Sequence, residues 1–384
     1  APPEIYPSTP SSAASDVYKR QVPYWGLYLK TLGFDVTEIG QLIAILLATK
    51  IVAPNVWGWI ADHTGHRMAI VRMASLLAAI TFAGVYLGSS YWWLAGVMTA
   101  FSFFWNASLP QFEATTMSHL GDETHRYSGI RLWGSVGFII TVALLGPLLD
   151  AWGTGLLPAI VLALFVLIWI SSIAVPETAA GHLSLGQQPL LQVLRRPLVL
   201  SLLTVCFLMQ ASHGPYYAFY TLYLGAAGYS TAFVGQLWAL GVVAEIGVFL
   251  LMPILLPRFG ARRLLLVAVC LTLLRWLLIA AFVDYPVVIV FAQTLHAASF
   301  GLYHAVAIFM IHMLFTGAHQ GRGQALYSSI SFGAGGAAGS LISGYLWTGI
   351  GPQAMYLMAA AVSLAATAVV YFGIRGVPDS GGRG

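Results

Sequence analysis

Long apolar runs alternate with short connections, polar or rich in glycine and proline, along almost the whole chain. At about 17–25 residues, each run is long enough to cross a bilayer as a helix. Eleven such runs lie near residues 39–60, 68–88, 92–115, 131–149, 155–175, 198–223, 232–256, 264–282, 286–314, 324–347 and 353–373. A twelfth span is represented by its tail, residues 22–29 (VPYWGLYL). The pattern therefore predicts an all-α polytopic membrane protein.

The composition agrees with this prediction. The chain is 59% apolar and 8% charged, with a mean hydropathy of +0.81. An ordinary soluble domain is roughly 45–50% apolar and about 25% charged. The two cysteines, Cys206 and Cys270, both fall inside apolar runs, and we interpret them as small core residues.

One stretch of the chain occurs twice. Residues 33–42 (GFDVTEIGQL) resemble residues 228–237 (GYSTAFVGQL), 195 positions later. The same offset relates Lys50 to Glu245, Gly65 to Gly260 and Arg67 to Arg262. A fixed offset indicates two copies of one unit, here six spans each. Copies of the same orientation imply two halves related by a pseudo-twofold axis along the membrane normal.

The repeat and the connections predict the domain boundaries. We expect an N-terminal helical half at 21–175, a linker at 176–196, a C-terminal helical half at 197–375 and a tail at 376–384. Residues 1–20 are rich in proline and serine, lack a starting methionine and cannot span a membrane. We expect this non-spanning tail to reflect a truncated or misjoined reading frame, or alternatively a disordered segment.

Basic residues predict the orientation, because cytoplasmic loops are enriched in lysine and arginine. With the 61–72 loop in the cytoplasm, the external loops hold Lys30. The cytoplasmic segments then hold Arg67, Arg72, Arg126, Arg131, Arg195, Arg196, Arg258, Arg262, Arg263, Arg322, Arg375 and Arg383. The linker and the C-terminus would be cytoplasmic, in a bacterial-type inner membrane. Since the positive charge is spread over short loops, it argues against a nucleic-acid partner.

Residues 58–67 (GWIADHTGHR) resemble the loop signature of the major facilitator superfamily, between its second and third helices. We expect Gly58 to let helices approach closely and Asp62 to cap a helix N-terminus. Gly65 and Arg67 complete the motif, which the resemblance links to conformational change. In the second copy, Pro257 stands where Asp62 would map.

Within that superfamily, residues 22–371 resemble the phenylpropionate permeases, and more distantly the lactose permease and nucleoside–proton symporter types. The segments that carry the likeness are VPYWGLYLK (22–30), IRLWGSVGFI (130–139), MQASHGPYYAFYTLY (209–223), GYSTAFVGQLWALGVVAEI (228–246), LLRW (273–276) and TLHAASFGLYH (294–304). The resemblance implies the major facilitator fold, with its first helix largely missing, and secondary active transport by alternating access.

Charged residues inside membrane spans cost free energy, and they are usually paired or functional. Lys50, Glu245 and Arg275 lie at about one depth, where transporters of this architecture bind substrate. Glu245 and Arg275 could form a structural bridge or belong to a binding or coupling site. The lactose permease type has a glutamate and an arginine at their positions, and the phenylpropionate permeases have a basic residue at that of Lys50. Glu113 and Arg131 lie near the cytoplasmic ends of the fourth and fifth spans. The lactose permease type has charged residues at the matching positions, where they contact sugar. Alternatively, Glu113 and Arg131 form a salt bridge at the edge of a loop.

Three histidines recur at steps of eight residues in the tenth span: His296, His304 and His312. On an α-helix each step turns the side chain by about 80° and raises it by about 12 Å, so the three cannot share one metal ion. By resemblance, His296 matches a coupling histidine, with Ser299 where the lactose permease type has a carboxylate. His304 and His213 are matched in the phenylpropionate permeases. Each histidine could instead be a hydrogen-bonded core residue.

Glycines and aromatics mark two further features. Gly214–Pro215 can break the seventh span, and Tyr216 and Tyr217 directly after it could stack on a flat substrate or simply pack. The segment 332–340 (FGAGGAAGS) carries small residues at helical spacing. We expect it to be a close packing surface, with a sliding gate as the alternative.

These features predict a proton symporter for a small aromatic carboxylate such as 3-phenylpropionate. Lys50 and Arg275 would neutralise the carboxylate, and Glu245 would be the leading proton site, with His296 as the second. A sugar or nucleoside permease, or a receptor of the same fold, is the alternative. The sequence shows no clustered nucleophile and base and no metal spacing, so we expect no enzyme, cofactor or metal. The partners would be the substrate, protons and lipid, and we expect a monomer.

Overall fold

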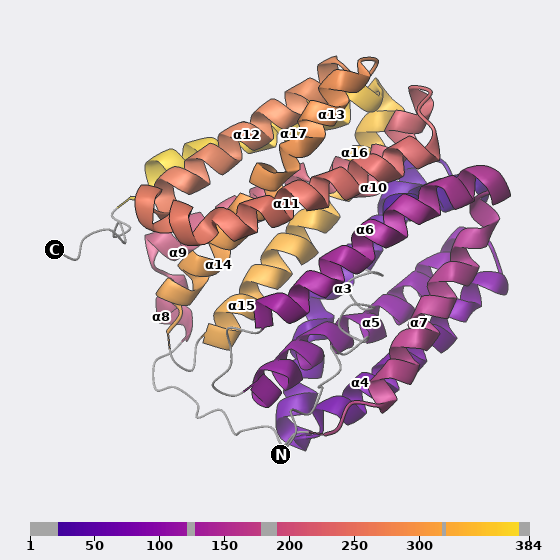
Figure 1. Cartoon of the computed structure of the whole chain (residues 1–384), viewed down its shortest axis with the longest axis horizontal. Helices are drawn as coiled ribbons and strands as arrows, with labels where there is room; N and C mark the ends of the chain where they lie inside the picture. The colour runs from indigo at the N-terminus through magenta and orange to yellow at the C-terminus, as the bar shows by residue number, and fades with distance from the viewer. Residues whose placement is uncertain (1–21, 121–126, 178–189, 317–319, 376–384) are drawn as a thin grey trace.

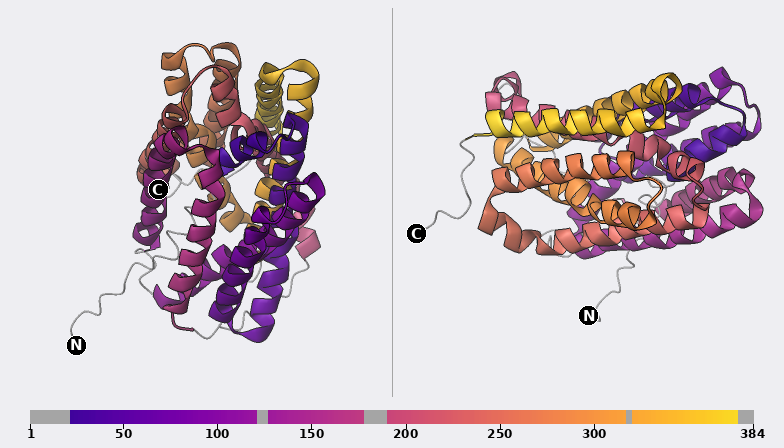
Figure 2. Two further views of the ribbon diagram at one scale, coloured as in Figure 1. Left: turned by 90° about the vertical axis from the view of Figure 1, so that its right-hand side faces the viewer. Right: turned by 90° about the horizontal axis from the view of Figure 1, so that it is seen from above.

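The computed structural model describes residues 22–120, 127–177, 190–316 and 320–375. These residues form two helical bundles that lie side by side, the N-half below and the C-half above in Figure 1. The two further views in Figure 2 show that the helices of both halves run along a common direction. The tails predicted at 1–20 and 376–384, and most of the linker, lie outside the described residues.

The N-half consists of five long helices after a short first one: α2 (Val22–Thr31), α3 (Val36–Thr64), α4 (Arg67–Ala83, extended by a 3-10 turn at Gly84–Tyr86), α5 (Tyr91–Leu120), α6 (Tyr127–Trp152) and α7 (Leu157–Ile173, after a 3-10 turn at Thr154–Leu156). The C-half follows the short helix α8 (Leu190–Leu194) and contains α9 (Pro197–Ser212), α10 (Gly214–Ala226), α11 (Thr231–Phe259), α12 (Ala261–Ala281), α13 (Pro286–Thr294), α14 (Tyr303–Leu314), α15 (Gln320–Ser328), α16 (Gly336–Ile350) and α17 (Pro352–Gly373).

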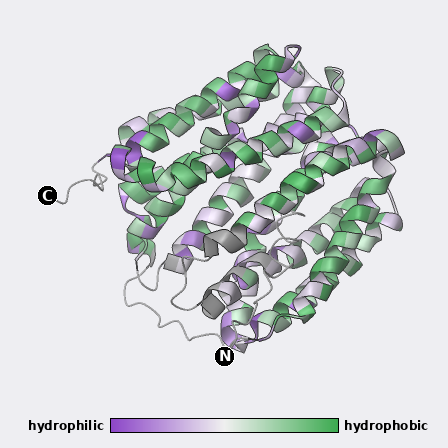
Figure 3. Ribbon diagram, viewed as in Figure 1, coloured by the Kyte–Doolittle hydropathy of each residue, from purple (hydrophilic) through white to green (hydrophobic). Residues whose placement is uncertain are grey.

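The helices fall where the apolar runs predict spans. Within the described residues, nine helical segments are long and apolar enough to cross a membrane. Figure 3 shows apolar residues along the lengths of the helices and few polar residues away from their ends. The prediction of an all-α polytopic membrane protein is confirmed. The outer face of α12 exposes Cys270, so our interpretation of it as a core residue is wrong, whereas Cys206 is buried.

Three C-half spans are interrupted near their middle. The seventh span breaks at His213, between α9 and α10, directly before Gly214–Pro215, as the sequence predicts. The tenth span contains the π-helix η4 (Ala297–Leu302), and the eleventh contains the π-helix η6 (Ser329–Gly335). A π-turn inside an α-helix is rare and often marks a functional position. The sequence analysis does not predict these two segments.

The repeat is visible in the backbone. Gly33 and its counterpart Gly228 have φ angles of 95° and 88°, and Gly65 and its counterpart Gly260 have 72° and 73°. Other residues rarely adopt this left-handed region, so glycine recurs at equivalent turns of both copies. The turns after α3 and α11 differ in ψ, −1° at Gly65 and 155° at Gly260, in agreement with the divergence of the second motif.

Two expectations for the 58–67 motif are wrong. Asp62 lies inside α3 and pairs with Arg67 at 3.7 Å, while the first amides of α4 donate to the Glu177 carboxylate. A carboxylate from the linker thus caps α4 because its chain returns to that helix end. Gly58 does not permit a close helix approach, because a Cβ placed there would meet nothing within 4 Å. Gly65 ends α3 in the left-handed conformation.

The two halves meet along a seam, chiefly where α3 packs against α16 and α6 packs against α11. A Cβ on Gly40 of α3 would lie 3.0 Å from the Ser340 carbonyl oxygen of α16. A Cβ on Gly335 would lie 2.5 Å from the Phe207 carbonyl oxygen of α9. The 332–340 segment is therefore a close packing surface toward both halves, as predicted.

The seam is closed at one end of the bundle. We call this end, which carries the turns at Gly33, Gly153, Gly228 and Gly351, the far end, and the opposite one, where the linker lies, the linker end. At the far end, the Asp150 carboxylate of α6 accepts bonds from the first amides of α11, at 3.1 and 2.8 Å. Thr37 and Thr348 also bond across the seam, at 2.9 Å.

Toward the linker end the two halves diverge. Helix α11 has buried residues from Val234 to Glu245 and none from Ile246 to Phe259. Leu132 and Trp133, toward the linker end of α6, are exposed as well. The described part of the chain thus has its closest contacts between α6 and α11 at the far end.

We expect Gly146→Val to open the far end of the seam. A Cβ at position 146 would lie 2.6 Å from the Thr231 carbonyl oxygen, so α6 and α11 could not keep their present distance. The readout is the rate at which a maleimide labels a cysteine introduced by Val234→Cys, in a protein whose two native cysteines are replaced by alanine. Val234 is 1% exposed in the structure. The rate should rise severalfold.

The matched control is Gly155→Val, because a Cβ at position 155 would meet nothing within 4 Å. Its labelling rate should equal that of the parent protein. Equal rates in Gly146→Val and the parent would show that this contact does not hold the far end closed.

Candidate functional site

A cluster of charged and titratable side chains lies in the middle of the C-half. Glu245 of α11, Arg275 of α12 and His296, directly before η4, form this charged cluster. Arg275 is fully buried, and Glu245 and His296 are each 4% exposed. Such groups are costly inside a membrane unless they satisfy one another. The structure thus brings together three of the residues that the sequence marks as candidates.

The Arg275 guanidinium is held by side chains on the neighbouring helix. Its Nη1 lies 3.1 Å from His296 Nδ1 and 2.9 Å from Ser299 Oγ. Its Nη2 donates to Gln293 Oε1 at 3.1 Å. Gln293 in turn donates to the Tyr216 hydroxyl at 2.7 Å, and the Tyr216 ring lies 4.2 Å from the guanidinium carbon. Arg275 therefore faces side chains on several sides and is enclosed in this conformation.

The contact with Arg275 fixes the tautomer of His296. Arginine can donate hydrogen bonds but cannot accept them, so His296 Nδ1 must be the acceptor. The proton of the neutral ring then sits on Nε2, which lies 3.6 Å from Glu245 Oε2. This distance is too long for a hydrogen bond but short enough for an ion pair if the imidazole is protonated. His296 therefore lies between the carboxylate and the guanidinium.

The π-helix sets the geometry around His296. The ring of Phe300 stacks on His296 (5.5 Å, 12°) and on His304 (5.6 Å, 8°). The three rings follow one another at steps of four residues, which place side chains near one face of a helix. Gly301 faces Glu245, and a Cβ there would lie 3.1 Å from its Cγ. The tenth span thus holds both histidines and Phe300 in one stack and places Gly301 of the π-turn against Glu245.

An aromatic face continues from this stack toward the seam. We use that name for Phe300, His304, Tyr327 and Phe332. The His304 Nδ1 atom and the Tyr327 hydroxyl are 2.7 Å apart, and Phe332 contacts the other three rings. Phe300, His304 and Phe332 are half-buried. The aromatic face therefore offers flat apolar surface beside polar ring atoms.

The aromatic face adjoins the N-half near Lys50. Ser329, in η6, donates to the Lys50 carbonyl oxygen at 3.4 Å, and Asn55 donates to Ser329 at 3.3 Å. Lys50 is half-buried on α3. It thus belongs to the seam, on the side opposite the charged cluster. The side chains of Glu113 and Arg131 lie outside the described residues.

The predicted residues of α10 and its break are mostly enclosed. His213 and Tyr216 are fully buried, and Tyr217 is half-buried. His213 Nδ1 lies 2.7 Å from the Met209 carbonyl oxygen, and its ring packs on the edge of Trp276 at 4.9 Å. Tyr216 packs on Trp238 at 4.3 Å. These side chains form a wall around the charged cluster.

Several polar residues near the site were not among the candidates. Gln293 and Ser299 hold Arg275, and in the N-half Thr49 links to Ser102 and Asn106 by hydrogen bonds of 3.0 Å each. Gln293 could have been found by its position one turn before His296 in an apolar run. Among the described residues, no group of three His, Cys, Asp or Glu side chains could hold a metal ion.

Comparisons with known proteins place the chain in context. The family model described as "MFS_1 like family" matches residues 20–358. The chain is 31% identical over 352 residues to a probable 3-phenylpropionic acid transporter of Escherichia coli (strain K12), covering 88% of this chain and 89% of that protein. It is 28% identical over 324 residues to a maltose permease of Geobacillus stearothermophilus, covering 80% and 78%. The structure of the nucleoside transporter NupG matches with a TM-score of 0.80 at 17% identity, covering 96% and 98%.

We expect Arg275→Met to destabilise the protein by about 3–5 kcal/mol, because it removes three buried hydrogen bonds and the cation that offsets the Glu245 carboxylate in the same cluster. The readout is the thermal unfolding midpoint in detergent. Adding Glu245→Gln should recover part of the loss, since the unpaired charge is then gone. The control is Arg263→Met, an exposed arginine of the same helix. Equal midpoints for the two single variants would contradict a structural coupling between Arg275 and Glu245.

Proposed function

The chain belongs to the MFS_1 like family of membrane transporters, and from this premise we propose that it carries a small aromatic carboxylate together with protons. It is an integral membrane protein that transports a small molecule, and its family consists of transporters rather than enzymes. The resemblance to the major facilitator superfamily and the prediction that the chain is not an enzyme are thereby confirmed. The substrate and the proton coupling are our proposal.

The placement of His296 between Arg275 and Glu245 is the observation that best supports proton coupling. Protonation of His296 Nδ1 uses the lone pair that accepts the Arg275 bond, so the ring cannot hold that proton and that bond together. A doubly protonated ring repels Arg275 and attracts Glu245, 3.6 Å away. Loading a proton would therefore change the position of Arg275 and, through Gln293, of α13. This links proton binding to helix movement.

The aromatic face and Lys50 support an aromatic carboxylate as the substrate. Phe300 and Phe332 offer flat surfaces on which a ring can pack. Lys50, across the seam on α3, would neutralise the carboxylate. The sequence analysis predicted that Arg275 would also neutralise the carboxylate. Because Arg275 is enclosed in this conformation, we assign it to proton coupling here. The Escherichia coli relative, a probable 3-phenylpropionic acid transporter, supports this substrate class.

The closed far end supports alternating access. If the arginine-rich linker end is cytoplasmic, as loop charges favour, the described conformation opens inward. Rocking of the halves about the seam would then break the Asp150 contacts and open the far end. We propose the bacterial-type inner membrane as the location and a monomer as the working unit. Glu113, Arg131, His213, Tyr216 and Tyr217 remain predictions for the substrate site.

A neutral, hydroxyl-rich substrate is the second candidate. The bonded group of Thr49, Ser102 and Asn106 includes the residue directly before Lys50 and could exchange hydrogen bonds with such a molecule. The relatives include a maltose permease, and the fold matches that of a nucleoside transporter. Accumulation of maltose or uridine in place of 3-phenylpropionate would favour this candidate. A receptor would bind ligand without accumulating it.

We expect cells that express the chain to accumulate labelled 3-phenylpropionate, and a protonophore to abolish the accumulation. Arg275→Ala should abolish it too, because the cluster loses the cation that responds to His296. Glu245→Gln should lose accumulation but keep exchange of labelled for unlabelled substrate, since exchange needs no net proton movement. Uptake at the level of empty cells by the unaltered chain would rule out the proposed substrate.

We expect Lys50→Gln to raise the KM for 3-phenylpropionate by about tenfold or more, because one buried carboxylate would lose its cation. The measurement is the concentration dependence of the initial uptake rate. The control is Lys30→Gln, an exposed lysine at the end of α2. An unchanged KM in Lys50→Gln would remove Lys50 from the substrate site.

A further inference from the structure

Two tyrosine hydroxyls are buried in the C-half without a partner among the described residues. Tyr220 of α10 and Tyr356 of α17 are both fully buried, and neither hydroxyl makes a hydrogen bond there. The Nε of Arg275, also buried, lacks a partner too. Buried polar groups are nearly always satisfied, and phenylalanine would fill the same space without this cost. These three atoms therefore indicate a bound molecule that forms hydrogen bonds with them.

The two tyrosines belong to a column of aromatic hydroxyls. Tyr216, Tyr220 and Tyr223 are four and three residues apart and share one face of α10. The Tyr216 and Tyr220 ring centroids are 4.9 Å apart, and those of Tyr223 and Tyr356 are 5.0 Å apart. Trp276 of α12 lies beside the column, 5.9 Å from Tyr216 and 6.0 Å from Tyr356.

One end of the column reaches the charged cluster. The Tyr216 hydroxyl accepts a bond from Gln293, which accepts one from Arg275. Trp276 lies between Tyr356 and Arg275, 6.0 Å from the Tyr356 ring and 4.6 Å from the guanidinium carbon. His213, which packs on Trp276, presents a further buried ring nitrogen, Nε2, without a partner. The Tyr216 ring also lies 5.4 Å from the His296 ring, so the column ends beside an imidazole that can take up a proton.

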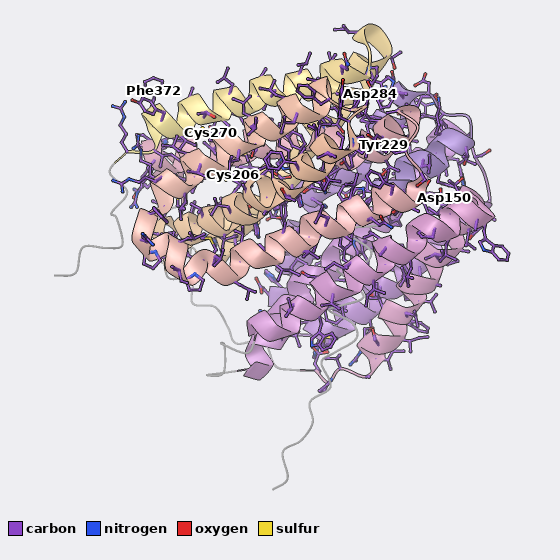
Figure 4. All side chains as sticks on the ribbon, turned by 45° about the horizontal axis from the view of Figure 1, so that its top comes forward. Asp150, Cys206, Tyr229, Cys270, Asp284 and Phe372 are labelled. Atoms are coloured by element: carbon purple, nitrogen blue, oxygen red, sulfur yellow. The ribbon has the colours of Figure 1, made fainter. Side chains whose placement is uncertain are left out.

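The other end reaches the far end of the bundle. Asp284, between α12 and α13, is exposed and interacts electrostatically with Tyr223 and Tyr229. The Tyr229 hydroxyl donates to the Val283 carbonyl oxygen at 2.8 Å, and Tyr223 donates to that of Ile279 at 3.4 Å. Figure 4 shows Asp284 and Tyr229 toward the same end of the molecule as Asp150. The polar groups therefore extend from this surface to the middle of the membrane.

A bound water suits the middle of the column. A buried water needs two to four polar partners, and the hydroxyls of Tyr220 and Tyr356 with the Arg275 Nε–H supply two donor–acceptors and a donor. A tyrosine hydroxyl can accept a proton on its oxygen while its own proton passes to the next acceptor. The side chain is neutral before and after, so such a relay needs no oxidant or other reactant.

We propose that Tyr220 and Tyr356, with water bound between them, form a proton route from Asp284 at the far end to the charged cluster. The route runs inside the C-half, whereas the substrate site lies at the seam. A proton can then reach His296 and Glu245 from the far side while the seam is closed there. This inference rests on the proposed proton coupling.

The test uses the double variant Tyr220→Phe/Tyr356→Phe of the full chain in proteoliposomes, with 3-phenylpropionate as the probe. One readout is the exchange of labelled for unlabelled probe, which moves no net protons. The other is the proton flux that the probe drives, followed with a pH-sensitive dye. We expect exchange close to the wild-type rate and a proton flux at least about tenfold lower.

The matched control is Tyr303→Phe, a buried tyrosine of the same half whose hydroxyl already donates to the Cys206 carbonyl oxygen. It should leave both readouts unchanged. A double variant with wild-type proton flux would overturn the route while leaving the proposed function intact. Equal losses of exchange and flux would also overturn it, because they indicate packing alone. A wild-type protein that moves no protons with the probe would refute the proposed coupling and the route with it.

Discussion

The architecture of the C-half depends on one buried cation. Arg275 carries a permanent charge in the middle of the membrane-spanning region and has no exposed surface. Its position requires a carboxylate nearby, acceptors at hydrogen-bond distance and aromatic rings at its faces. Glu245, His296, Gln293 and Tyr216 meet these needs from three different spans. The need to hold this charge therefore determines how α10, α11, α12 and α13 pack.

That requirement also orders the side chains along the tenth span. Arg275 bonds residues 293, 296 and 299, which span about two turns of one helix. Phe300 and His304 follow His296 at steps of four residues, and their rings stack along the helix. Groups that hold the charge and groups on the aromatic face thus follow one another along a single helix. Movement of Arg275 would be transmitted directly to the aromatic face.

The sequence predicted the features that depend on local chemistry. Apolar run length located the spans, the 195-residue offset located Gly33 and Gly228, and Gly214–Pro215 located the break in the seventh span. It failed where a distant segment decides the outcome. Glu177 rather than Asp62 caps α4, because the linker folds back onto that helix. The order Glu245–His296–Arg275 could not be derived, because it depends on how three helices pack and on a π-turn without a sequence signal.

The π-turn at 297–302 has a consequence for how this chain can diverge. A π-turn contains one residue more than the α-helical turn that it replaces. Because the wide turn absorbs this residue locally, deleting one residue there would restore a regular α-helix and leave the segments on both sides close to their present orientation. The side chains inside the turn, such as Ser299 and Phe300, would shift or be lost, and with them a bond to Arg275 and the ring that stacks on both histidines. A one-residue gap in this segment would therefore change the charged cluster and the aromatic face while the rest of the span keeps its place.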